Sequence, residues 1–133
     1  MYHAAPINDY FQPALHIPEA GVAELRLTIR QDFHHAAHAA HGAIYFKALD
    51  DATFFAANSL IEDVFVLTVS FNLYLTRPVS EGEVVARGRV VSRSKRLYLA
   101  EGILEDARGR DIARGSGAFM PSAISLSGLK DYR

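Results

Sequence analysis

Regular alternation of apolar and polar residues marks five segments of the chain as predicted β-strands. The clearest is 23–30, where alanine, leucine and isoleucine at odd positions alternate with polar residues. Such alternation is typical of a strand with one face on a core and the other in water. The other predicted strands are 64–76, 83–91, 97–104 and 112–120. In 64–76, four side chains are expected to share one face: Val69, Phe71, Leu73 and Leu75.

A helix is predicted from residue 42 to about residue 60. Apolar residues recur there at spacings of four, four and three: Ile44, Ala48, Ala52 and Phe55. Further apolar side chains on other sides, including Phe46 and Phe54, predict that the helix is enclosed by its surroundings. One such helix with five antiparallel strands predicts an α+β fold in which a sheet curls around a central helix.

The composition fits one ordered domain and excludes several kinds of chemistry. The chain has 133 residues, 50% of them hydrophobic, so we expect a single domain over 1–133. A net charge of −1 gives no support to nucleic-acid binding. The absence of cysteine removes disulfides, thiolate zinc sites and cysteine nucleophiles. No apolar run is long enough to span a membrane and no targeting segment is evident, so we expect a cytoplasmic protein.

Two adjacent aspartates, Asp50 and Asp51, stand on the predicted helix. Burying a carboxylate without a partner is costly, so acids are rarely placed on an enclosed helix without cause. The alternative interpretation is structural, with both aspartates on an exposed polar arc and Lys47 as an ion-pair partner. Helical periodicity does not choose between the two aspartates.

His41 and Gly42 stand where the predicted helix begins. Backbone N–H groups at a helix N-terminus lack intrahelical partners, so they can bind an anion or a developing oxyanion. Gly42 has no side chain to keep a carbonyl group away from the backbone. An ordinary helix start with a small residue is the alternative.

All six histidines lie in the first 41 residues, and four of them fall within 34–41. His34, His38 and His41 have spacings that would align them on a helix, which suits a metal only if this segment is helical. We favour loop histidines beside a cleft, and we predict no metal or other cofactor.

A basic cluster, Arg93, Lys95 and Arg96, falls at the bend between two predicted strands. Such side chains can bind the phosphates of a small ligand. A solvated hairpin end explains the same cluster without a ligand, and the residues alone favour that explanation.

The run from His41 to Asp50, HGAIYFKALD, resembles the His-Gly-Gly helix of the hotdog-fold acyl-CoA thioesterases of the phenylacetate-pathway (PaaI) type. That family carries an aspartate nine residues after the histidine, which corresponds to Asp50. It can also carry a catalytic-site Ser or Thr ten residues before the proline of a strand-end pattern, here LTRP at 75–78, which corresponds to Thr68. The resemblance covers roughly residues 20–120.

Three positions depart from the family pattern. Ala43 replaces the second glycine of the helix motif. His35 stands where the family often has an asparagine that helps to hold the thioester. Lys95 replaces a glycine before Arg96. The change at His35 bears on the identity of the substrate more than on the type of reaction.

The resemblance implies an acyl-CoA thioesterase in which Gly42, with Ala43, polarises the thioester carbonyl. It implies that Asp50 acts as a general base or as a nucleophile, and that Thr68 orients the water or Asp50. The other expected contacts with the carbonyl side and the CoA phosphates are His41, His35, Arg93, Lys95 and Arg96.

The spacing of Gly42 and Asp50 adds a geometric expectation. Eight residues of helix separate them by about 12 Å, whereas one carbonyl must lie close to both the oxyanion donor and the attacking group. We therefore expect a composite site made of Gly42 from one subunit and Asp50 from a two-fold partner. The resemblance also implies a homodimer, often assembled as a dimer of dimers.

Two other functions stay open at this point. A hotdog-fold enoyl-CoA hydratase or dehydratase would act on acyl chains, although its local motifs are not found. A non-catalytic acyl-CoA-binding module would bind without turnover, which the presence of Asp50 argues against. The acyl group is open too, because aromatic residues such as Phe46 and Tyr74 suit an aryl or a medium aliphatic chain.

Overall fold

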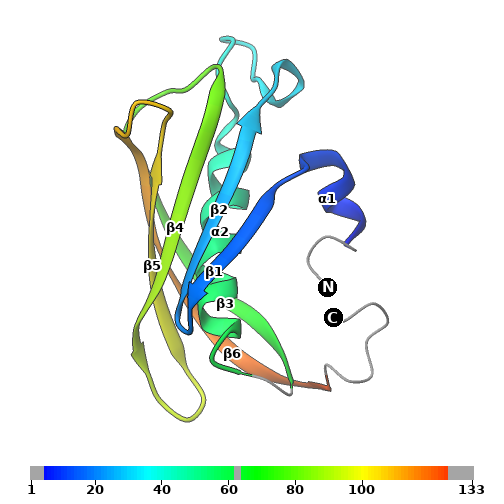
Figure 1. Cartoon of the computed structure of the whole chain (residues 1–133), viewed down its shortest axis with the longest axis vertical. Coiled ribbons are helices and arrows are strands. Elements are labelled where there is room, and N and C mark those ends of the chain that lie inside the picture. The colour runs from blue at the N-terminus through cyan, green and yellow to red at the C-terminus, as the bar shows by residue number, and fades with distance from the viewer. Residues whose placement is uncertain (1–4, 62–63, 126–133) are drawn as a thin grey trace.

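A six-stranded antiparallel sheet curves around one long helix in the computed structural model, which describes residues 5–61 and 64–125 (Figure 1). The strand order is β1-β2-β4-β5-β6-β3, so that β1 and β3 form the two edges. The elements in chain order are α1 (Pro6–Phe11), β1 (Ala14–Glu19), β2 (Val22–Ile29), a 3-10 turn at Gln31–Phe33, α2 (Gly42–Asn58), β3 (Val64–Leu75), β4 (Gly82–Arg93), β5 (Tyr98–Glu105) and β6 (Asp111–Ser125).

Helix α2 is the centre of the core, as its apolar residues on several sides predict. Its residues Leu49, Ala52 and Ala56 are fully buried. The helix lies so close to β4 that a side chain at Gly88 would meet the carbonyl oxygen of Ala52 at 2.5 Å. This approach requires glycine, because a Cβ atom has no room there. The predicted α+β arrangement, a sheet curled around a helix, is confirmed.

The predicted strands are all present, with ends that differ by a few residues. The alternation in β2 is confirmed, since Ala23, Leu25, Leu27 and Ile29 are all buried. The last strand is longer than predicted and runs on past Pro121 to Ser125. Residues 126–133 lie outside the described part of the chain.

Strand β3 differs from its predicted pattern because of a β-bulge. The register with β6 shifts between Thr68 and Ser70, which reverses the face on which successive side chains lie. Phe71 and Leu73 are half-buried as expected, but Val69 lies within the bulge and is 56% exposed, so the prediction of a single shared face was wrong for Val69. Leu75 follows Phe71 and Leu73 in the same alternation and is 52% exposed as the last residue of the strand.

Two elements have no counterpart among the predictions. Helix α1 and edge strand β1 precede β2, and α1 is attached by aromatic contacts of Tyr10 and Phe11 with Phe33. The guanidinium of Arg30 lies 4.3 Å from the centre of the Phe33 ring, which adds a cation–π contact. Among the described helices, none is long and apolar enough to cross a membrane.

Candidate active site

Asp50 lies in the middle of α2 and faces β3, where Thr68 meets it. The Thr68 hydroxyl donates a hydrogen bond to Oδ1 of Asp50 at 3.1 Å. The bulge after Thr68 explains how this residue faces the helix while Phe71 also packs inward further along the strand. Two candidates from the sequence, Asp50 and Thr68, are thus in direct contact.

Burial gives the Asp50 carboxyl unusual electrostatics. Loss of solvation raises its pKa to about 6, because a charged carboxylate is poorly stabilised away from water. The hydrogen bond from Thr68 lowers this pKa, Asp51 raises it and Lys47 lowers it, each by less than burial does. Near neutral pH, Asp50 can therefore both accept and release a proton, as a general base must.

Asp51 has a different environment from its neighbour. Its Oδ2 atom lies 2.6 Å from Nζ of Lys47, one turn earlier on the same helix, and both side chains are only 14% exposed. The ion-pair interpretation was therefore correct for Asp51, while Asp50 faces the sheet. The structure separates two residues that helical periodicity left equivalent.

His41 caps the N-terminus of α2. Its backbone is extended, with φ −61° and ψ 146°, and its Nδ1 atom accepts a hydrogen bond from the N–H of Ala43 at 3.0 Å. The N–H of Ile44 donates to the carbonyl of His41. Within the described residues, the N–H of Gly42 has no such partner. Gly42 therefore carries the available donor of this helix start, whereas the N–H of Ala43 is already engaged.

His34, His35 and His38 lie in the loop between the 3-10 turn and α2, so this segment lacks the helical alignment that a metal site needed. His34 and Ala40 form a β-bridge, and Nε2 of His34 donates to the carbonyl of Ser80 at 2.7 Å. His38 has a left-handed backbone, with φ 65°. Across residues 5–61 and 64–125, no group of three or more potential metal ligands is present.

His35 repeats the local hydrogen bond of His41. Its Nδ1 atom accepts a hydrogen bond from the backbone N–H of Ala37 at 3.0 Å, and the backbone N–H of His35 donates to the carbonyl of Ala39. A neutral imidazole that accepts at Nδ1 carries its proton on Nε2. Both His35 and His41 thus have an Nε2–H group that can donate to another acceptor.

The basic cluster Arg93, Lys95 and Arg96 lies at the turn between β4 and β5, far from Gly42 of the same protomer. Figure 1 shows this turn at the end of the molecule opposite to the start of α2. The pairing agrees, since Ile29, which leads toward the start of α2, pairs with Gly82 at the other end of β4. One protomer therefore does not bring the basic cluster and Gly42 together.

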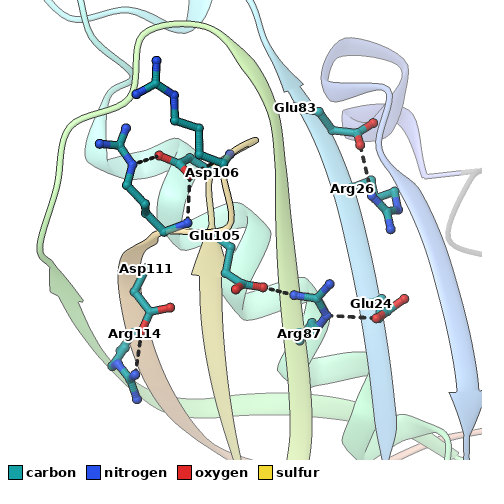
Figure 2. Close-up of polar contacts among 10 residues, drawn as sticks. Glu24, Arg26, Glu83, Arg87, Glu105, Asp106, Asp111 and Arg114 are labelled. Carbon is teal, nitrogen blue, oxygen red and sulfur yellow. Dashed lines mark hydrogen bonds and ion pairs between the residues drawn. The ribbon is translucent and has the colours of Figure 1, made fainter.

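The outer face of the sheet carries ion pairs that the sequence patterns did not single out. Figure 2 shows Arg87 on β4 between Glu24 on β2 and Glu105 on β5, and Arg114 beside Asp111. All of these residues except Glu24 also line a groove of about 610 Å³ on that face. Opposite charges on neighbouring strands stabilise a solvated sheet face, and this groove contains none of the candidate catalytic residues.

The aromatic candidates for an acyl pocket are dispersed. Phe46 is 41% exposed and lies edge-on against Phe71, with ring centres 5.3 Å apart. Tyr74 lines the groove on the outer face instead, so it does not lie near Asp50. Phe46 is the aromatic residue of α2 that is exposed, whereas Tyr45 and Phe55 are buried.

Comparisons with known proteins give the family. The family model of the Thioesterase superfamily matches residues 30–113, more than half of the chain. No curated protein sequence matches this chain significantly. The PaaI protein of Escherichia coli, from the phenylacetic acid degradation operon, superposes with a TM-score of 0.86 at 16% identity, over 94% of this chain and 90% of that one. A thioesterase family protein from Silicibacter pomeroyi gives a TM-score of 0.82 at 26% identity, over 90% of each chain.

These similarities agree with the architecture and with the helix motif. The hotdog fold predicted from the sequence is confirmed by a long helix inside a curved antiparallel sheet and by the likeness to PaaI. The matched region contains α2, with Asp50, and Thr68 on β3. The chain belongs to the thioesterase superfamily and has the hotdog fold.

Proposed function

We propose that this protein hydrolyses acyl-CoA thioesters, with Asp50 as the group that activates water. The contact between Asp50 and Thr68 carries the proposal, because it places a hydroxyl against a half-buried carboxylate on the central helix. A carboxylate whose pKa lies near 6 is a better base than an ordinary surface aspartate. Membership of the thioesterase superfamily indicates that the bond cleaved is a thioester.

The reaction follows from these groups. Asp50 takes a proton from water, the water oxygen attacks the thioester carbonyl, and negative charge develops on the carbonyl oxygen. The C–S bond then breaks, so the acyl group leaves as a carboxylic acid and the CoA thiolate takes up a proton. In the alternative course the Asp50 carboxylate itself attacks the thioester carbonyl and the CoA thiolate leaves. This forms an anhydride with Asp50, which water then hydrolyses. Thr68 orients Asp50 in either course.

The N–H of Gly42 stabilises the developing oxyanion at the positive end of α2. The Nε2–H groups of His35 and His41 stand on the same loop and position the carbonyl side of the substrate. Since about 12 Å of helix separates Gly42 from Asp50, the complete site combines Asp50 with Gly42 of the partner subunit.

Edge strand β3 supports pairing with a second copy. Among the described strands it pairs with β6 alone, so within that part of the chain its other edge offers unpaired backbone groups. Leu67, Val69 and Leu75 expose about half of their surface along it. A two-fold axis beside β3 sets the two α2 helices antiparallel, which brings each Asp50 toward the helix start of the other copy.

The same two-fold arrangement gives the basic cluster a role. Arg93, Lys95 and Arg96 lie at the end of one protomer opposite to its own Gly42, and hence at the end where an antiparallel copy presents its helix start. The CoA phosphates of a substrate held there are the anions that these side chains would bind.

The direct test is release of CoA from a panel of aryl, short, medium and long acyl-CoA esters. We expect turnover of at least one class. Tight binding without turnover across the panel would indicate a binding module instead. Hydration of an enoyl-CoA without release of CoA would indicate a hydratase, and either result would overturn the proposal.

The pH dependence of kcat/KM is expected to follow Asp50. The carboxylate is the active form, so activity should rise with pH through about 6. Thr68→Val removes a hydrogen bond that lowers this pKa, so the rise should move to higher pH and kcat should fall about 10-fold. Profiles of the wild type, Thr68→Val and the hydroxyl-retaining control Thr68→Ser check this. A wild-type profile that stays flat from about pH 5 to pH 7 would contradict the assignment.

Replacing Arg93, Lys95 and Arg96 together by alanine is expected to raise KM for an acyl-CoA by about 10- to 100-fold, since exposed charged contacts contribute modestly. The kcat should change little, because these side chains lie away from the reacting bond. The control substrate is the N-acetylcysteamine thioester of the same acyl group, which has no phosphates. Equal losses on both substrates would refute phosphate binding by the cluster.

A further inference from the structure

Neighbouring aspartates on α2 have separate partners. Oδ1 of Asp50 accepts a hydrogen bond from the Thr68 hydroxyl on β3, and Oδ2 of Asp51 lies 2.6 Å from Nζ of Lys47. The Lys47 and Asp51 side chains are each 14% exposed, so solvent and salt weaken their attraction less than they would on an open surface. A pair in this setting interacts more strongly than one on an open surface.

Lys47 is the one cation in the sequence of α2, and two carboxylates of the same helix stand close to it along the chain. It precedes Asp50 by three residues and Asp51 by four, and both spacings place side chains beside each other on a helix. The ring of Phe11 lies 5.3 Å from Nζ of Lys47 and covers it from the side of α1. In the structure Lys47 pairs with Asp51, which leaves the Asp50 carboxylate with the neutral donor of Thr68.

Within residues 5–61 and 64–125, the core gives Asp50 no other charged neighbour. Among the described residues, Asp51 and Lys47 are the charged groups that act on it. The strands packed against α2 turn uncharged side chains inward, namely Leu15 on β1, Leu25 on β2, Val84 on β4, Leu104 on β5, Phe119 on β6 and Thr68 on β3. A change in the Lys47–Asp51 pair is therefore transmitted to Asp50 without compensation from the sheet.

We infer that Asp51 is a positioning residue for the proposed reaction: by binding Lys47, it keeps this cation away from Asp50 and leaves the Asp50 carboxylate to Thr68 and water. The inference rests on the proposed role of Asp50. It assigns to Lys47 and Asp51 a task beyond the stabilisation of the helix that an i,i+4 ion pair gives.

The sign of each change follows from the charges. Asp51 raises the pKa of Asp50 and Lys47 lowers it. Asp51→Asn removes the first influence and frees Lys47 to approach Asp50, so the carboxylate should titrate at lower pH. Lys47→Gln removes the cation and leaves Asp51 charged, so Asp50 should titrate at higher pH. The double variant Lys47→Gln/Asp51→Asn loses both charges and should lie between the two.

The experiment records the titration of the Asp50 side chain by carbon-13 NMR in the full-length protein, together with the pH profile of kcat/KM. We expect Asp51→Asn to shift both midpoints down by about one pH unit, and Lys47→Gln to shift both upward. Thermal unfolding identifies any variant that fails to fold. The other variant, which is expected to shift the Asp50 midpoint in the opposite direction, then provides the test. If Asp51 and Lys47 had a structural role alone, the two variants would lower stability or kcat, but they would not shift the titration of Asp50 in opposite directions.

Failure of this inference can be told apart from failure of the proposed function. Equal Asp50 midpoints in the wild type, Asp51→Asn and Lys47→Gln would overturn the role of Asp51, whatever the activity. Midpoints of Asp50 that move as expected would support control of Asp50 by the pair. If the pH profile of kcat/KM did not follow them, the error would lie in the assignment of Asp50 as the base.

Discussion

Replacing Asp50 by asparagine is expected to lower kcat for acyl-CoA hydrolysis about 1000-fold, since general bases typically contribute between about 100- and 10,000-fold. Asparagine keeps the size of the side chain and can still contact the Thr68 hydroxyl, but it cannot take a proton from water or attack the thioester. The measurement is the initial rate of CoA release at a pH above the titration of Asp50, with KM determined alongside.

Asp50→Asn should fold normally, because burial disfavours the charged form of Asp50 and the variant removes that charge. We expect its melting temperature near neutral pH to equal or exceed that of the wild type. Asp111→Asn is the matched control, since Asp111 is an exposed aspartate on β6, paired with Arg114. A variant Asp50→Asn with wild-type kcat would exclude Asp50 from the reaction.

Replacing Gly42 by proline is expected to lower kcat by about 100- to 1000-fold, the usual loss when one oxyanion donor is removed. Proline has no N–H, so the substitution deletes the proposed donor itself. The helix should tolerate it, because Gly42 is the first residue of α2 and proline is favoured at that position. The extended backbone of His41 is also the conformation that a residue before proline adopts.

Gly42→Ala separates loss of the donor from the effect of a side chain. A Cβ atom at this position would lie 3.3 Å from Cδ1 of Leu75, a flexible side chain that can move slightly. The alanine variant keeps the N–H, so we expect kcat within about 3-fold of the wild type. Equal losses in the alanine and proline variants would show that bulk, rather than the donor, matters at Gly42. Circular dichroism checks that both variants keep the helix.

The sequence predicted the helix and its motif well because these depend on local patterns. Apolar spacing located α2, and the aspartate nine residues after His41 pointed to Asp50. Helical periodicity alone leaves Asp50 and Asp51 equivalent, since adjacent helical positions lie only about 100° apart, and it was the resemblance to the family motif that selected Asp50. The different surroundings of the two needed tertiary information, with Thr68 meeting one carboxylate while Lys47 paired with the other.

Other features lacked a readable local signal. Strand β1, ALHIPE, contains Pro18 and lies at an edge with most of its residues exposed, so it shows no apolar alternation. The bulge in β3 changes the face of later residues without a sequence mark, which misplaced Val69 relative to Phe71. The histidine spacing suited a helix, but backbone pairing of His34 with Ala40 makes the segment a loop.

A mixed dimer shows whether each site joins Asp50 of one subunit to Gly42 of the partner subunit. Asp50→Asn and Gly42→Pro chains with different affinity tags are co-expressed, and the heterodimer is purified through both tags. One of its two sites then contains an intact Asp50 and an intact Gly42, so we expect the heterodimer to have about half of the wild-type rate although both parent homodimers are nearly inactive. A heterodimer as inactive as its parents would contradict the shared site, because each protomer would then need both residues itself.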